Sequence, residues 1–200
     1  MVNIMAIRKV VQYGDKVLRT PTKEVHKISS KIQKLIDDLM DTMYAQNGVG
    51  LAAPQVGESY RIFVIDTSTG DEPLNPIVFV NPKIIKKSGA TLSYEGCLSF
   101  PEAYTNVKRY AEVIVRAKDE KGRPFTIEAK DGSLLARAIQ HEMDHLDGIL
   151  FIDHSMNRFE TNQELANKGL PPVDPEYLLD EAELEELLQK CAAAKGANKE

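Results

Sequence analysis

Hydrophobic residues recur every three or four positions in two long stretches of the chain, which predicts two main α-helices. In the first stretch Ser30 and Gln33 form a capping-box pattern, and Asn47-Gly48 marks the end. The apolar positions between these signals are Ile32, Leu35, Ile36, Leu39, Met40 and Met43. The methionines fit a buried core stripe better than a functional one, because Met readily fills irregular core space.

The second helical stretch follows Asp131-Gly132-Ser133, which supplies an N-cap, and ends at Gly148. Its apolar stripe comprises Leu134, Leu135, Ala138 and Ile139. Two histidines, His141 and His145, continue the same face one helical turn apart. We therefore expect both histidines on a buried or half-buried face of this helix.

Runs of β-favouring residues predict several strands between the two helices. They span 61–66, 77–81 with a continuation over 83–85 after Pro82, 112–118 and 123–130. The last two runs are joined by Asp119-Glu120-Lys121-Gly122, a hairpin signal. Because strands and helices do not alternate regularly, we predict an α+β fold with mostly antiparallel strands around the histidine-bearing helix.

The character of the sequence changes after Asp153. A polar stretch and a Pro-rich segment over 169–175 lead to a helical pattern over 180–190 with an acidic first half. We predict a main domain over residues 1–155. Residues 156–200 are predicted to form a C-terminal appendage with one surface helix, not a separate domain.

Composition narrows the classes of protein that need to be considered. Of the 200 residues 42% are hydrophobic and 28% charged, as in an ordinary globular protein. The net charge of −5 gives no general attraction to DNA or to an anionic membrane. The N-terminus lacks a secretory signal, and only Cys97 and Cys191 are present, so we expect a cytoplasmic protein whose thiols stay reduced.

The residues with the clearest chemistry are His141, Glu142 and His145, an H-E-x-x-H motif. Both imidazoles can reach one metal ion, with the glutamate beside them as a candidate general base. The alternative is a pair of core histidines on an amphipathic helix. Most single cysteines are inert, but Cys97 in Glu95-Gly96-Cys97-Leu98-Ser99 would complete a Cys-His-His set with an open fourth position, as catalytic metal sites have.

Three segments together resemble the peptide deformylase family. They are the G-φ-G-φ-A-A-x-Q motif at Gly48–Gln55, the E-G-C-L-S motif at Glu95–Ser99 and the Q-H-E-φ-D-H motif at Gln140–His145, where φ is apolar. All three are complete and stand in the family's order. The resemblance covers roughly residues 6–155 and makes residues 1–155 a metal-dependent catalytic domain.

The resemblance implies an enzyme that removes the N-formyl group from the initiator methionine of nascent polypeptides and releases formate. Metal-bound water would attack the formyl carbonyl with Glu142 as general base. Gln55 and the backbone N–H of Leu98 would stabilise the oxyanion. The implied metal ligands are Cys97, His141 and His145, and the implied substrate-binding residues are Val49, Gly50, Gly96, Leu134 and Ala138.

The choice of metal stays open at the level of sequence. A thiolate and two imidazoles suit zinc by ligand type. The resemblance instead implies ferrous iron as the usual metal, with zinc, nickel or cobalt able to replace it.

Two features depart from the family. Tyr104 stands where some members carry a substrate-contacting arginine, and neither Arg109 nor Arg137 is assigned that role. The acidic tail differs from the basic C-terminal helix with which some members dock on the ribosome, so transient ribosome contact is not supported through this segment, since phosphates repel acidic residues.

Two rival functions remain at this point. A zinc peptidase would use Glu164 as its third ligand, at a spacing from His145 that some H-E-x-x-H peptidases use. A metal-binding or metal-sensing module would keep the ligands without turnover. The presence of both Glu142 and Gln55 favours an enzyme, because metal binding alone needs neither.

Overall fold

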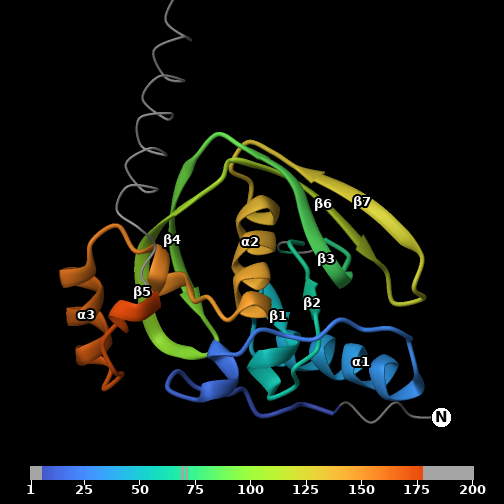
Figure 1. Cartoon of the computed structure of the whole chain (residues 1–200), viewed down its shortest axis with the longest axis horizontal. Coiled ribbons are helices and arrows are strands. Elements are labelled where there is room, and N and C mark those ends of the chain that lie inside the picture. The colour runs from blue at the N-terminus through green and yellow to red at the C-terminus, as the bar shows by residue number, and fades with distance from the viewer. Residues whose placement is uncertain (1–5, 69, 71, 178–200) are drawn as a thin grey trace, which may run out of the picture.

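The computed structural model describes residues 6–68, 70 and 72–177 of the chain (Figure 1). Its helices are α1 (Ser30–Ala45), α2 (Leu134–Asp147) and α3 (Arg158–Asn167). The strands are β1 (Gly50–Ala52), β2 (Ile62–Ile65), β3 (Ile77–Ser88), β4 (Thr91–Cys97), β5 (Phe100–Arg109), β6 (Glu112–Lys118) and β7 (Pro124–Ala129).

The strands form two separate antiparallel sheets in the described part of the chain. One sheet has the order β1-β2-β3-β6-β7, and the other consists of β4 and β5 alone. Figure 1 shows α2 standing between the two sheets, with α1 below the end of the larger one. The predicted α+β class, with antiparallel strands around the histidine-bearing helix, is confirmed.

Strand β2 is buried on both faces because α1 and α2 lie on opposite sides of it. Ile62 and Val64 pack in the cluster that contains the apolar stripe of α1. Phe63 and Ile65 pack in the cluster that contains the apolar stripe of α2. All four side chains are fully buried, so this strand is a continuous apolar run without polar alternation.

A serine side chain caps the start of each of these two helices, and a left-handed glycine ends α2. Ser133 accepts a hydrogen bond from Ala136 N, and Gly148 closes α2 with φ of 74°, as predicted. The prediction for α1 was wrong by one residue: Ser29, not Ser30, is the N-cap and accepts from Ile32 N. The two serines are adjacent, and capping by Ser29 lets Ser30 begin the helix, with Gln33 N bonded to the Ser29 carbonyl.

The predicted strands all occur, and four further elements were not foreseen. One is the short strand β1 after α1. The region around Cys97 is a hairpin of β4 and β5, and the polar stretch after Asp153 contains α3. Part of the predicted appendage packs against β5: Leu165 and Val173 are buried with Phe100 and Phe151. The surface helix predicted over 180–190 lies outside the described residues.

No helix in residues 6–68, 70 and 72–177 has the length and apolar content needed to cross a bilayer.

Candidate active site

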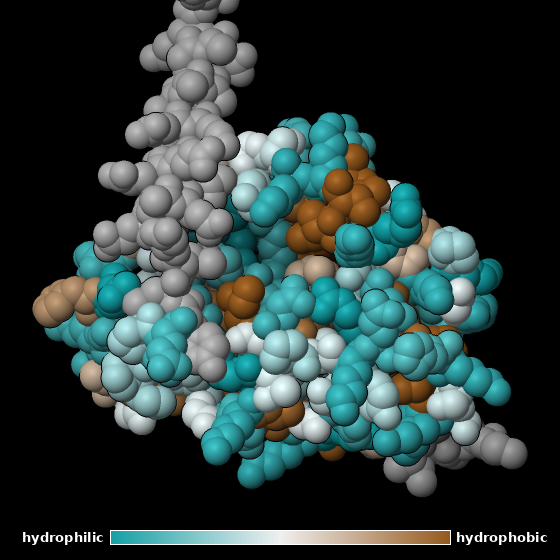
Figure 2. Space-filling model, viewed as in Figure 1, coloured by the Kyte–Doolittle hydropathy of each residue, from teal (hydrophilic) through white to brown (hydrophobic). Residues whose placement is uncertain are grey.

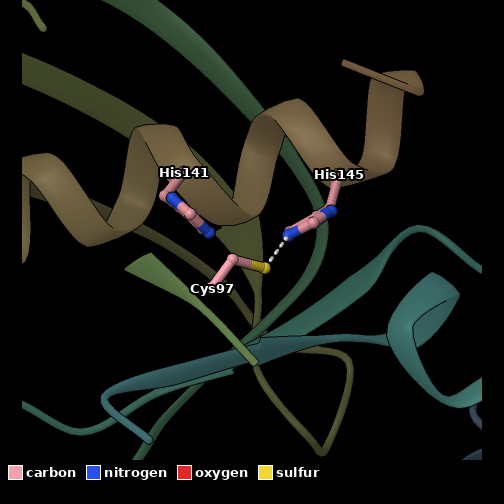
Figure 3. A group of neighbouring side chains, drawn as sticks. All are labelled: Cys97, His141 and His145. Carbon is pink, nitrogen blue, oxygen red and sulfur yellow. Dashed lines mark hydrogen bonds between the residues drawn. The ribbon is translucent and has the colours of Figure 1, made fainter. Parts of the chain in front are cut away.

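Helix α2 and the end of β4 bring together three side chains of the metal-ligand type. Figure 3 shows His141 and His145 projecting from the same side of α2 toward Cys97. One donor atom from each of the three residues lies within 4.8 Å of the other two. Cys97 Sγ is 3.3 Å from His145 Nε2.

The 3.3 Å between Cys97 Sγ and His145 Nε2 is the spacing expected of two ligands of one divalent ion. Zinc-type bonds of roughly 2.0–2.3 Å in a tetrahedron place neighbouring donors about 3.3–3.8 Å apart. A thiolate and two imidazoles are also the donor types that transition metals prefer. The three residues therefore form a metal-binding arrangement.

His141 is held by a chain of buried charges behind it. Its Nδ1 lies 3.0 Å from Glu95 Oε2, which leaves Nε2 for the site. Glu95 accepts two hydrogen bonds from Arg109, at 3.0 and 2.9 Å. Arg109 also bonds Asp144, whose Oδ2 lies 2.9 Å from His154 Nε2. Such outer contacts fix the ring orientation of a metal-ligating histidine.

The same charges shift the pKa values of the site in opposite directions. Burial would raise the pKa of Glu95, but the charge of Arg109 and the hydrogen bond of His141 outweigh it and lower this pKa to about 2. Burial would lower the pKa of His141, yet Cys97 and Glu95 raise it well above its ordinary value. Burial and the neighbouring His141 lower the pKa of His145. A metal ion would displace a proton from His141, so binding should strengthen as pH rises.

Glu142 is buried beside these ligands and faces the cleft. Burial and the nearby charge of Glu95 raise its pKa to about 7, against the opposing effect of His141. Its Oε2 has no hydrogen-bond partner among the described residues. A Cβ on Gly50 would approach Glu142 Oε1 to 2.5 Å, so a larger residue at this position would have to displace the carboxyl group.

Gln55 is 1% exposed and fixed at both ends of its amide. Its Oε1 accepts from Ala52 N at 2.8 Å, which orients Nε2 toward Cys97 Sγ at 3.3 Å and Ser99 Oγ at 3.4 Å. The donor end of the amide therefore points at the metal-ligand group. Leu98, the residue after Cys97, lies in the turn that joins β4 to β5.

The candidate residues meet in a cleft of about 560 Å³. His145 lies behind its wall and is 1% exposed. The other residues predicted from the sequence all line the cleft: Val49, Gly50, Gln55, Gly96, Cys97, Leu98, Leu134, Ala138, His141 and Glu142.

The residues that support the ligands were not predicted from the sequence. Glu95 and Asp144 stand inside two of the motifs, yet no role was assigned to either. A usable signal exists for Glu95, because residues two apart on a strand share a face and Cys97 faces α2. Gln140 was also missed; its amide bonds both the N–H and the carbonyl of Tyr110, at 2.8 and 2.9 Å, and so fixes α2 to the segment after β5. No local pattern in the sequence indicates that long-range contact.

Glu164, the ligand expected for a peptidase, is not part of this donor group. It lies on α3, which packs against β5 in a different cluster. Arg109 is buried in the charge chain and does not line the cleft, whereas Arg137 and Tyr104 do.

Together the fold and the site define an α+β protein with a Cys-His-His metal-binding arrangement at a cleft that also holds a buried carboxyl group. The sequence profile of the polypeptide deformylase family matches residues 7–162. The chain belongs to this family, and it is an enzyme of that class. The zinc peptidase and the non-enzymatic module are thereby set aside.

The alignments with individual relatives cover most of the length of each relative. A peptide deformylase of Thermodesulfovibrio yellowstonii is 49% identical over 149 residues, which are 74% of this chain and 89% of the relative. Peptide deformylase 1 of Bacillus subtilis is 47% identical over 163 residues, which are 82% of this chain and 98% of the relative.

Solved structures show the same fold. The peptide deformylase of Synechococcus elongatus in complex with actinonin has a TM-score of 0.80 at 43% identity, covering 87% of this chain and 92% of that chain. The class I type b peptide deformylase of Acinetobacter baumannii with bound Met-Ala-Ser has a TM-score of 0.71 at 32% identity, covering 76% of this chain and 99% of that chain.

Proposed function

We propose that this enzyme removes the formyl group from the initiator methionine of nascent polypeptides and releases formate. The observation that carries the proposal is the position of Cys97, His141 and His145 at a cleft that also contains Glu142 and Gln55. A metal, a base and an amide donor in one cleft are the parts that hydrolysis of an unactivated amide needs.

Cys97, His141 and His145 would hold one divalent ion. When bound, such an ion polarises a carbonyl and makes water a nucleophile near neutral pH. We propose ferrous iron as the native metal, on the family resemblance, with zinc, nickel or cobalt able to substitute. The thiolate and two imidazoles are compatible with each of them.

Glu142 moves the proton in this mechanism. Its carboxylate takes a proton from the attacking water while the water oxygen joins the formyl carbon. It then gives that proton to the leaving nitrogen as the C–N bond breaks, so that formate and a free amine are the products. Burial raises the pKa of Glu142, which favours transfer of the water proton to its carboxylate.

Gln55 and Leu98 stabilise the charge that develops on the formyl oxygen. The Nε2 group of Gln55 is already oriented into the site by the bond between its Oε1 and Ala52 N. The backbone N–H of Leu98 would supply the second donor. A preoriented donor costs no rearrangement during the reaction.

The substrate binds as an added strand between β1 and β4. Each of these strands pairs with only one other strand in the described structure, so each has a free edge. Val49, Gly50 and Gly96 would pair with the peptide backbone. Leu134 and Ala138 would wall the pocket for the methionine side chain. The bound Met-Ala-Ser of the Acinetobacter baumannii relative supports a substrate that begins with methionine.

We place this reaction in the cytoplasm, where Cys97 stays reduced and nascent chains are available. The partners are formyl-Met peptides of nascent chains. Contact with the ribosome would be transient, and the acidic tail does not support it.

The test measures formate release from formyl-Met-Ala-Ser, with acetyl-Met-Ala-Ser and an internal peptide as comparators. We expect formate from the first peptide and no cleavage of internal bonds. Glu142→Gln should keep the metal, measured by elemental analysis, and lose most turnover. Cleavage of internal bonds would instead support a peptidase, and metal binding without any product would support a metal-binding module. A Glu142→Gln variant with near-normal kcat at full metal occupancy would remove the proton-transfer role.

A further inference from the structure

Four unpaired cations stand on the larger sheet, outside the cleft that holds the candidate metal ligands. Lys83 and Lys86 belong to β3, and Arg116 and Lys118 belong to β6. All four are exposed, none lines the cleft, and none has an ion-pair partner within residues 6–68, 70 and 72–177. The whole chain has a net charge of −5, so this group is a local departure from the overall charge.

The alternation of β6 puts two of these cations on the face of the sheet that is turned away from α2. Val113, Val115 and Ala117 are buried in the cluster that contains the apolar stripe of α2. Because successive side chains of a strand point to opposite faces, Arg116 and Lys118 point to the other face.

The ladder between β3 and β6 adds the other two cations to the same face. Lys83 is the direct partner of Arg116, and Lys86 is the direct partner of Ile114, which shares a face with Arg116. Like charges in directly opposite positions destabilise a sheet. The fold alone therefore gives no reason for a lysine opposite Arg116.

Helix α1 covers only part of this face. Its apolar stripe packs with residues of β2 and with Val78 and Val80 at the start of β3, but the described cluster contains no residue of β6 or β7. The strand order places β6 and β7 at the end of the sheet opposite to β1, which carries Gly50 of the cleft. A partner on the uncovered part of the face would not need to touch the cleft.

The acidic residues that β6 and β7 place on this face are already engaged. Glu128 pairs with Lys130 at 3.1 Å, and Glu112 accepts a hydrogen bond from Ser88 Oγ at 2.9 Å. Glu128 is the ladder partner of Ile114, so both acidic residues lie toward the start of β6. The other end of the face is positive.

We propose that the basic face formed by Lys83, Lys86, Arg116 and Lys118 is a docking surface for the phosphate backbone of RNA. Same-face residues of one strand are about 6.5 Å apart and neighbouring strands about 4.8 Å apart. The cations thus form two short rows that can follow a backbone with regularly repeated negative charges. Bound phosphates would also offset the repulsion between Lys83 and Arg116.

Other occupants fit this face less well. A second copy of the chain, bound through a twofold axis, would set the basic face against an identical basic face. Ile85 on β3 is 45% exposed, but Figure 2 shows that apolar residues form small groups among hydrophilic ones on the face that it draws. Such a surface offers little to an apolar partner or to a bilayer interior.

Two arguments favour RNA over DNA. Thr126 is the ladder partner of Arg116 on β7 and adds a hydroxyl group to the face, and the 2′-hydroxyl is the group by which a protein distinguishes RNA. The choice also rests on the proposed function, because nascent polypeptides are made beside RNA.

The experiment measures how a fluorescent RNA hairpin binds the full-length, metal-loaded protein, by anisotropy over a range of salt. With four phosphate contacts, the affinity should fall on the order of 50-fold between about 50 and 200 mM salt, a log–log slope of about −3. Lys83→Gln and Arg116→Gln should each make the slope shallower by about 1, whereas Arg116→Lys keeps the charge and should keep the slope.

Lys168→Gln is the matched control. It also removes one cation, but Lys168 lies 3.3 Å from Glu102 of the two-stranded sheet. It should leave RNA affinity and slope unchanged. Formate release from formyl-Met-Ala-Ser should be the same in all four variants, because none of the substituted residues lines the cleft.

A DNA duplex of the same sequence and a polyglutamate peptide identify the class of partner. RNA should bind roughly three- to tenfold more tightly than DNA, the range that one hydrogen bond gives. Equal binding of DNA, or equal binding of polyglutamate, would overturn the choice of RNA. An RNA affinity that survives unchanged in Lys83→Gln and Arg116→Gln would refute the docking face. Formate release is measured separately, so a failure of the proposed function would appear there and not in the RNA titration.

Discussion

Cys97 sits at the end of β4, and its surroundings separate a metal ligand from an ordinary buried thiol. Its sulfur receives Gln55 Nε2 at 3.3 Å and Ser99 N at 3.4 Å and lies 3.3 Å from His145. An ordinary core cysteine packs among apolar atoms, whereas this sulfur lies among polar groups and beside both histidines of the metal-ligand set.

We therefore expect Cys97→Ala to abolish tight metal binding, since two imidazoles remain without the anionic donor. Metal content after gel filtration is the measurement. Glu164→Ala is the control, because Glu164 lies outside the donor group, and it should retain one ion per chain. Metal lost from Glu164→Ala and kept by Cys97→Ala would contradict the ligand assignment.

Gln55 allows a test that separates catalysis from packing. Gln55→Glu keeps an oxygen that can accept from Ala52 N but removes the NH₂ donor near Cys97. If that donor stabilises the oxyanion, kcat should fall on the order of 10²–10³-fold. Circular dichroism and metal content check that the variant is folded and loaded. A folded Gln55→Glu protein with the wild-type rate would show that this amide only packs.

The candidate metal ligands and the candidate base could be predicted from the sequence. The buried charged residues that orient them could not. The metal-ligand types and Glu142 follow from a local H-E-x-x-H pattern, and Cys97 from a three-motif resemblance. The contact of Arg109 with both Glu95 and Asp144 joins three segments, and no spacing in the sequence encodes it.

Among the helices and strands, those with a regular hydrophobic pattern were predicted and those with a weak pattern were missed. Strands β6 and β7 alternate regularly and were foreseen, together with their hairpin. Strand β5 was missed because its inward residues include Ala103 and Thr105, which give little hydrophobic signal, and because Pro101 and Asn106 disfavour strands. Helix α3 buries only Thr161 and Leu165, so its amphipathic pattern is weak.

Asp66 ties the loop after β2 to α1 and makes the stability of this region pH-dependent. Its carboxylate accepts from Tyr44 Oη at 2.7 Å, from Asn75 N at 2.9 Å and from Ser68 N at 2.9 Å. Burial would raise the pKa of Asp66, but a hydrogen bond from the Ser68 hydroxyl, together with these three, outweighs it and lowers the pKa. A lowered pKa means that the bonds stabilise the fold above about pH 3.9, the ordinary aspartate value, and that this contribution is lost as pH falls through the folded pKa.

Asp66→Asn should therefore lower the free energy of unfolding by about 1–3 kcal/mol at pH 7. The difference from wild type should narrow below about pH 3.9. Urea unfolding at pH 7 and at a pH below about 3.9 measures the free-energy difference between the two proteins. Asp37→Asn, on the exposed face of α1, serves as the control with little effect at pH 7. A deficit that stays constant down to acid pH would rule out the ionised carboxylate as its source.

At the scale of the whole molecule, the end of the described chain is part of the core. Val173 is 3% exposed, its N–H bonds Asn162 Oδ1 at 2.9 Å, and the carbonyl of Pro172 accepts from Tyr13 Oη at 3.0 Å. The proline-rich segment thus closes over the β5 cluster and does not act as a free linker.

Two truncations should consequently behave differently. Removal of residues 178–200 should leave kcat/KM close to wild type, because every candidate site residue precedes Asp153. Removal of residues 169–200 should lower the free energy of unfolding by about 1.5–3 kcal/mol through loss of the Val173 side chain alone. Thermal unfolding and formate release measure both. Equal stability of the two truncated proteins would show that the segment over 170–173 contributes nothing.

The two sheets remain separate, and a metal ion bound between them would therefore affect the stability of the fold as well as the activity. Cys97 belongs to the two-stranded β4–β5 sheet, whereas both histidines belong to a helix packed on the larger sheet. A two-stranded sheet is marginal by itself. An ion that bridges the two would add its binding free energy to that of the fold, in proportion to the logarithm of its free concentration. The lifetime of the enzyme in a cell would then follow the supply of metal as well as the rate of synthesis, and starvation for the metal would remove the protein as well as its activity.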